Sequence, residues 1–147
     1  MVSVGPAMLN AALGVVRARV SFWQGDQELC QGDVLLHSMS VREWEAAIRA
    51  LIAGEVAREV VHFPAESPEL IITAWRHTYD PGTGPFTCYE LVIALDAGVF
   101  DPSEGISGTG PGVYLAPGPE GLLKFAEDLL AETEAVLKPK RLFGRKR

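Results

Sequence analysis

Three histidines and two cysteines are the residues whose types could support catalysis. His37, His62 and His77 have an ordinary pKa near neutrality, and Cys30 and Cys88 could act as nucleophiles. A hydrolase would need a nucleophile on a sharp turn beside a histidine, but the sequence has no Gly-x-Ser-x-Gly turn. Both cysteines lie in apolar segments, where thiols are inert. We therefore expect no catalytic residue, and a small hydrolase using His62 or His77 is the third hypothesis.

The same residues do not predict a metal site, because none lies at the close spacing that zinc ligands need. Asp96, Asp101 and Glu104 lie in or beside a Gly-, Ser- and Pro-rich segment, 97–111, but lack the pattern of a calcium loop. The glycines of 108–112 precede a predicted strand and have no Lys-Ser/Thr, so they do not predict a phosphate loop. We expect no metal and no cofactor. For the cysteines, two reduced buried thiols are favoured over a disulfide between neighbouring strands.

Charge is divided unevenly along the chain. The net charge is −6, from 13 basic and 19 acidic residues. Six of the basic residues lie in positions 138–147, which contain no acid, so the rest of the chain has seven basic residues against 19 acidic ones. An acidic body disfavours nucleic acid as a partner and favours a basic protein. We interpret the tail as a solvating terminus; the alternatives are a weak contact with nucleic acid or anionic lipid, or a contact with the acidic body of the chain itself.

The first half of the chain predicts a hairpin and a helix. Residues 15–23 alternate apolar and polar side chains, and 24–27 have turn chemistry, so 28–37 is expected to return beside them. Ser40 and Glu43 match a capping box at the start of a helix over about 41–53. Gly54 follows its last turn, where a left-handed residue ends many helices. Gly32 indicates a bulge or an early end of the second strand.

The second half predicts three or four further strands and a second helix. The expected strands are 59–63, 69–77, 86–95 and 113–116, with a longer hairpin loop at 78–85. Their short connections imply antiparallel pairing. In the most apolar strand, Phe86–Leu95, alternate residues from Tyr89 to Leu95 share one face. Pro119 suits the first turn of a helix over about 119–137.

These elements predict an α+β fold in the order ββαββββα. We expect two layers: a mainly antiparallel sheet of five to six strands, with both helices packed on one face. A single domain is expected over 15–137, after a loosely ordered N-terminus at 1–14 and before a mobile basic tail at 138–147. No apolar run reaches the ~20 residues of a membrane-spanning helix. The first residues lack the basic start of a secretory signal, so we expect a cytoplasmic protein.

One resemblance accompanies this order of elements. It covers about 15–137 and is carried by apolar residues at characteristic places: Trp44 and Leu51 in the first helix, Phe63 at a strand end, Pro68-Glu69-Leu70, the strand Tyr89–Leu95 and the helix Leu122–Leu130. In this pattern the chain resembles the WapI-type immunity proteins, small bacterial proteins that neutralise polymorphic toxins. The resemblance implies a non-enzymatic protein that binds and blocks a toxin.

The leading hypothesis is therefore a non-enzymatic protein-binding domain, acting on a basic partner through an acidic surface. The predicted contact residues are Asp80 in the hairpin loop and Asp96, Asp101 and Glu104 in the long loop. The second hypothesis is an accessory or scaffold subunit that forms a homodimer through an exposed sheet edge or an apolar sheet face.

Overall fold

The computed structural model describes residues 2–7, 14–56, 58–63, 70–95 and 112–138. Within these ranges the chain forms seven strands and two helices. In chain order they are β1 (Val2–Ala7), β2 (Val15–Gln24), β3 (Gln27–His37), α1 (Ser38–Ala53), β4 (Arg58–Phe63), β5 (Leu70–Tyr79), β6 (Phe86–Leu95), β7 (Gly112–Leu115) and α2 (Pro119–Leu137). The α+β class is confirmed.

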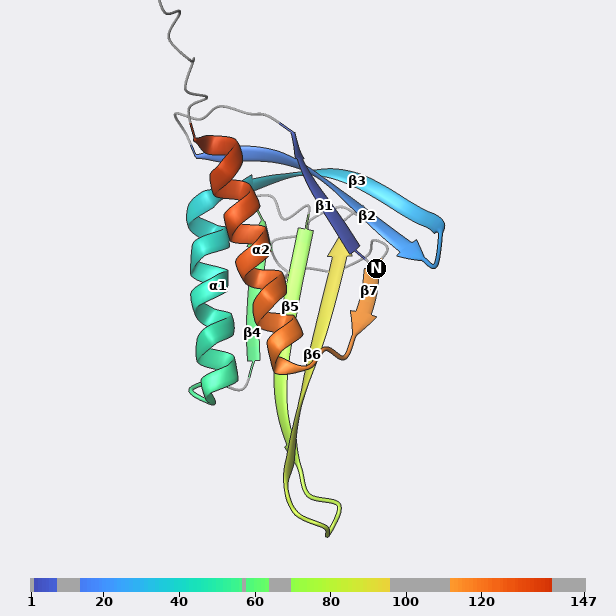
Figure 1. Ribbon diagram of the computed structural model, residues 1–147, viewed down its shortest axis with the longest axis vertical. Helices are drawn as coiled ribbons and strands as arrows, with labels where there is room; N and C mark the ends of the chain where they lie inside the picture. The colour runs from blue at the N-terminus through green and yellow to red at the C-terminus, as the bar shows by residue number, and fades with distance from the viewer. Residues whose placement is uncertain (1, 8–13, 57, 64–69, 96–111, 139–147) are drawn as a thin grey trace, which may run out of the picture.

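The strands form two antiparallel sheets. One has the order β1-β2-β3 and the other the order β4-β5-β6-β7. Figure 1 shows the three-stranded sheet crossing one end of the four-stranded sheet, with α1 and α2 side by side against the latter. The β5–β6 hairpin extends beyond the helices at the opposite end (Figure 1).

The sequence predicted five to six strands in a single sheet, whereas the described residues form seven strands in two sheets. The predicted order holds from β2 to α2, but β1 comes before it, and the strands divide into two sheets. β1 contains Gly5 and Pro6, which weaken a strand signal, yet an edge strand tolerates proline. The division of the strands into two sheets was missed for a different reason. Alternation predicts which face of a strand is buried, but not which strands pair across a helical connection.

Gly32 lies where the two sheets approach each other. A Cβ at this position would lie 3.0 Å from Cδ1 of Leu95, at the end of β6. The bulge or early strand end expected here is absent from the described strand β3, which continues to His37; the register shift falls between Phe22 and Trp23. Gly32 instead provides the space that brings a strand of one sheet against the other.

The two helices end as the sequence indicates but α1 begins earlier. Gly54 has φ of 82° and caps the C-terminus of α1, and Pro119 begins α2. The expected start of α1 at Ser40 is wrong, because His37 is the N-cap and its Nδ1 accepts a hydrogen bond from the N–H of Met39 at 3.3 Å. An imidazole nitrogen thus replaces the hydroxyl of the predicted capping box.

A single core joins both sheets to both helices. Trp44 of α1 is fully buried, and its ring meets Phe125 of α2 edge to face with 5.7 Å between centroids. Alternate residues of β6, from Tyr89 to Leu95, face this core as predicted. The core is completed by residues of β2, β3, α1, β5 and α2: Ala18, Val20, Phe22, Val34, Leu36, Val41, Ile48, Leu51, Leu70, Ile72, Ala74, Leu122, Ala126 and Leu129.

Candidate functional site

The face of the four-stranded sheet that points away from the helices carries exposed aromatic and charged side chains. Strand alternation directs them there, because residues two apart on a strand share a face. Ile71 and Thr73, near the start of β5, are buried on this face, so its exposed part begins at Trp75. We call this exposed part the outer patch, and it consists of Arg58, Trp75, His77, Tyr79, Phe86, Glu90 and Tyr114.

The far end of the outer patch is an aromatic pair on the projecting hairpin. Tyr79 and Phe86 are register partners, and their rings meet edge to face at 5.8 Å between centroids. They are 59% and 52% exposed, although an edge-to-face pair of this size would normally help to fill a core. Asp80 stabilises the turn beyond them, since its carboxylate accepts hydrogen bonds from the N–H groups of Gly82 and Gly84 at 2.8 and 3.3 Å.

A hydrogen-bonded row crosses the middle of the outer patch on three strands. The hydroxyl of Tyr114 donates a hydrogen bond to Oε1 of Glu90 in β6, with 2.7 Å between the two oxygens. The other carboxylate oxygen of Glu90 lies 2.8 Å from Nε2 of His77. The hydrogen bond from Tyr114, and then His77, lower the pKa of Glu90. The same hydrogen bond raises the pKa of the Tyr114 hydroxyl. Both carboxylate oxygens are used, so Glu90 connects Tyr114, which is 60% exposed, to His77 across the sheet face.

The edge of the outer patch near α1 is formed by an indole and a cation. The guanidinium carbon of Arg58 lies 5.5 Å from the ring centroid of Trp75, a cation–π arrangement. Trp75 is also the register partner of Glu90. The patch therefore combines four aromatic rings with one cation and one carboxylate within a single sheet face.

The outer patch lacks the parts of a catalytic site. His77 and Glu90 meet on the sheet face, where their side chains are 50% and 35% exposed. Cys88 is the register partner of His77, is reduced, and forms no hydrogen bond with it in the described part of the chain. The described residues also contain no group of three or more His, Cys, Asp or Glu side chains placed to hold a metal ion. The arrangement is suited to binding a surface.

The structure places the residues predicted as partner contacts or as catalytic bases in different surroundings. Asp80 lies at the hairpin tip, beside the aromatic pair, and its carboxylate holds the turn. Asp96, Asp101 and Glu104 lie outside the described residues. Of the candidate bases, His37 caps α1, and His77 belongs to the outer patch. His62 lies in β4, where the backbone alone is described.

Sequence reasoning missed Tyr79, Phe86 and Tyr114 as surface residues. The signal was available for Phe86, because the alternation that places Tyr89 and Leu91 in the core places Phe86 on the opposite face. For Tyr114 the pairing of β7 with β6 was needed, since its exposure depends on its position opposite Val92.

The acidic side chains of the described chain gather on the two helices, which form the helix layer. Arg42 and Arg49 of α1 pair with Glu134 and Glu127 of α2 at 2.7 and 2.6 Å, and Arg49 also pairs with Glu45. These pairs occupy both arginines of α1. Further carboxylates are exposed without an ion-pair partner among the described residues: Glu43, Glu120 and Glu132.

Comparison of the sequence with protein-family models and with curated proteins, and of the fold with solved structures, found no match. Neither described helix has the length and apolar character needed to cross a lipid bilayer.

Proposed function

We propose that this chain is a non-enzymatic protein-binding domain whose partner contacts the outer patch. The observation that carries the proposal is the exposure of Tyr79, Phe86 and Tyr114 on hydrogen-bonded strands. Tyrosine, tryptophan, phenylalanine and arginine are the residues enriched in protein interfaces and in their energetic centres. The outer patch contains all four types.

The geometry also lowers the cost of binding. Tyr114 is held by Glu90, and Tyr79 and Phe86 hold each other edge to face. Side chains that already have their bound orientation lose less conformational entropy when a partner arrives. A rigid aromatic surface of this kind supports binding more than catalysis, because it offers no enclosed volume for a reacting molecule.

The finer proposal is that the partner is basic, and that the chain acts in the cytoplasm as an immunity-like protein that neutralises a cationic toxin. Two features support it: the resemblance in element order to the WapI-type immunity proteins, and the exposed carboxylates Glu43, Glu120 and Glu132 on the helix layer, which have no ion-pair partner within the part of the chain that the structure describes. Acidic side chains steer a basic partner and raise its association rate. The predicted contacts Asp80, Asp96, Asp101 and Glu104 belong to this proposal.

A second candidate function is self-association as an accessory or scaffold subunit. It is favoured by the same aromatic surface and by the short edge strand β7, whose free side could pair with another strand. Sedimentation at micromolar concentration separates the two candidates. A homodimer that persists at high salt and dissociates on Phe86→Ala would favour self-association over a basic partner.

The main test compares two double variants of the same hairpin. Tyr79→Ala with Phe86→Ala removes the aromatic pair from the outer patch, whereas Thr78→Ala with Thr87→Ala changes the neighbouring register pair on the opposite face. Tagged full-length chains are used to capture proteins from the source cells, and captured proteins are quantified by mass spectrometry. We expect one partner to be retained by the wild type and the threonine variant and lost by the aromatic variant.

Equal recovery of that partner by both double variants would contradict binding through the outer patch. The finer proposal has its own measurement, the association rate with the captured partner as salt is increased. The rate is expected to fall steeply, because salt screens long-range attraction. A rate that does not change with salt would contradict electrostatic steering while leaving the outer patch in place.

A further inference from the structure

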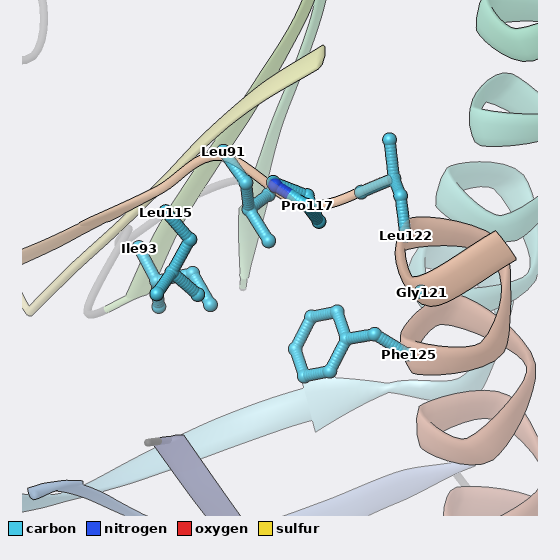
Figure 2. A pocket seen from close by; sticks show the side chains of 7 residues that line it. All are labelled: Leu91, Ile93, Leu115, Pro117, Gly121, Leu122 and Phe125. Atoms are coloured by element: carbon cyan, nitrogen blue, oxygen red, sulfur yellow. The ribbon is translucent and has the colours of Figure 1, made fainter. Parts of the chain in front are cut away.

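An apolar cavity lies on the other side of the four-stranded sheet from the outer patch. It has a volume of about 270 Å³. Figure 2 shows its walls: Leu91, Ile93 and Leu115 project from β6 and β7, and Leu122 and Phe125 from α2, with Pro117 between the two groups. Gly121 completes the lining at the first turn of α2. The cavity therefore lies between the first turns of α2 and strands β6 and β7 of the four-stranded sheet.

The side chains that form the walls are hydrocarbon. None of the seven lining residues has a polar side-chain atom. Leu91, Ile93 and Leu122 are buried and form the inner part, whereas Leu115, Pro117 and Phe125 are half-buried and Gly121 is exposed. The cavity is thus a half-open pocket whose floor lies in the core and whose opening is near Gly121.

Water is a poor occupant of such a volume. A buried water molecule needs two to four polar partners, and an apolar cavity of roughly 150 Å³ lined by Leu, Ile and Phe stays dry and binds benzene. An unfilled volume also destabilises a fold in proportion to its size, because the wall atoms lose contacts. Both effects favour an occupant that restores hydrocarbon contacts without needing hydrogen bonds.

We propose that this cavity is a binding site for a small neutral apolar molecule, such as an aromatic hydrocarbon or a short alkyl group. The volume admits one such molecule of about 7 to 10 carbon atoms, by comparison with benzene in the smaller cavity. A charged or strongly polar ligand is disfavoured in the inner part, since polar atoms placed against Leu91, Ile93 and Leu122 would lose water without gaining a partner. This site is separate from the outer patch, because Leu91 and Ile93 alternate with the outward-facing Glu90 and Val92 on β6.

Gly121 offers a direct way to fill the cavity. A Cβ at this position would have Pro117 Cβ, 4.0 Å away, as its nearest neighbour, so a side chain can be added at the opening without displacing backbone. Gly121→Leu places a four-carbon side chain there. Ala131→Leu is the matched control, because Ala131 lies on the same helix and its side chain is exposed away from the cavity.

The experiment uses toluene as the probe and phenol as a probe of equal size that carries one hydroxyl. Methyl signals of the full chain are followed by NMR during titration, and the melting temperature is measured with each probe. Toluene is expected to shift the methyl signals of Leu91, Ile93, Leu115 and Leu122 in a saturable manner and to raise the melting temperature. Phenol should bind more weakly, because its hydroxyl stays hydrated only in the orientations that point it through the opening near Gly121.

The variants decide whether the binding is at this cavity. Gly121→Leu should abolish the toluene shifts, and Ala131→Leu should leave them unchanged. Toluene shifts that are absent in the wild type, or that persist in Gly121→Leu, would overturn the proposal. A wild-type homodimer that Gly121→Leu dissociates and Ala131→Leu does not would make a second copy of the chain the occupant, and would overturn it too.

Discussion

The two faces of the four-stranded sheet differ in how far their apolar and aromatic side chains are buried. On the face that meets the helix layer, Leu91 and Ile93 are almost fully buried, and the charges above them are paired between α1 and α2. On the opposite face, Tyr79, Phe86 and Tyr114 remain more than half exposed. Scattered exposed apolar residues are ordinary, but a contiguous group of aromatic rings on ordered strands indicates a contact surface.

The difference shows which side chains serve stability and which serve another purpose. Burial of an aromatic side chain stabilises a fold, and exposure forfeits most of that contribution. Residues of the helix layer and its sheet face should therefore be sensitive to mutation, whereas residues of the outer patch should change binding more than stability. Four measurements test this contrast.

The largest expected difference in stability is between variants of two tryptophans, one in the core and one in the outer patch. Trp44 is fully buried against Phe125, so Trp44→Ala should lower the free energy of unfolding by about 3–5 kcal/mol. Trp75 is half-buried in the outer patch, and Trp75→Ala should cost about 1 kcal/mol or less. Urea denaturation of both variants provides the comparison. Equal losses would show that the outer patch is as important to stability as the core.

A smaller effect is expected where α1 meets the β5–β6 hairpin. Gly54 has φ of 82°, and a Cβ there would lie 3.3 Å from the guanidinium of Arg76. Gly54→Ala should therefore destabilise the fold by about 1–2 kcal/mol from backbone strain, with a further loss if Arg76 is displaced. Gly25→Ala is the control, since Gly25 has φ of 59° and no neighbour within 4 Å. A greater loss of stability in Gly25→Ala than in Gly54→Ala would contradict the expectation that the contact with Arg76 adds to the cost at Gly54.

The hydrogen-bonded row of the outer patch predicts a pH dependence. Because Tyr114 and His77 lower the pKa of Glu90 in the folded state, the stability that the row contributes is present above the unfolded pKa of the carboxyl group. It is lost as the pH falls through the lower, folded pKa. The opposite holds for Tyr114, whose pKa is raised, so its contribution is lost as the pH rises through that value.

Carboxyl NMR titration of Glu90 measures this directly. The wild-type midpoint should lie below 4.5, the ordinary value for a glutamate, and Tyr114→Phe should move it upward. An unchanged midpoint in Tyr114→Phe would mean that the hydroxyl does not hold the carboxylate in solution. The partner affinity of Tyr114→Phe would then reveal whether a held ring matters for binding.

The smallest effect belongs to the charges of the helix layer. Arg49→Gln removes the pairs with Glu45 and Glu127. Arg49 and Glu127 are about half exposed, although Glu45 is largely buried, so the loss of stability should be slight and should shrink at about 1 M salt, where the Debye length is near 3 Å. Glu132→Gln, which breaks no ion pair among the described residues, should show no such loss. A loss in Arg49→Gln that persists at high salt would indicate that packing of its side chain, not its charge, stabilises the helix layer.

Much of the fold was predictable because local patterns have local causes. Gly54 ends α1 because glycine tolerates a left-handed backbone, and Pro119 begins α2 because its missing N–H costs nothing there. The buried set on β6 follows from strict alternation. The start of α1 was misplaced because two kinds of side chain, Ser40 and His37, could each accept a backbone hydrogen bond.

The candidate site was less predictable than the fold. Acidic loop residues were favoured because charge is visible in a sequence, whereas Tyr79, Phe86 and Tyr114 resemble core residues by type. Their exposure follows from the length of the hairpin beyond the helices and from the pairing of β7 with β6. The cavity was not predictable either, since its volume depends on how far the start of α2 lies from Leu91 and Ile93.

The sequence by itself determined the helices, six of the seven strands and the core-facing side of β2 and β6, because helix caps and periodicity act between residues close in the chain. Only the tertiary structure decided that the strands form two sheets, that Tyr79, Phe86 and Tyr114 stay exposed on one sheet face and that a cavity remains under α2. Those features depend on packing between segments that are distant in the chain, and no single stretch of sequence contains both partners of such a contact.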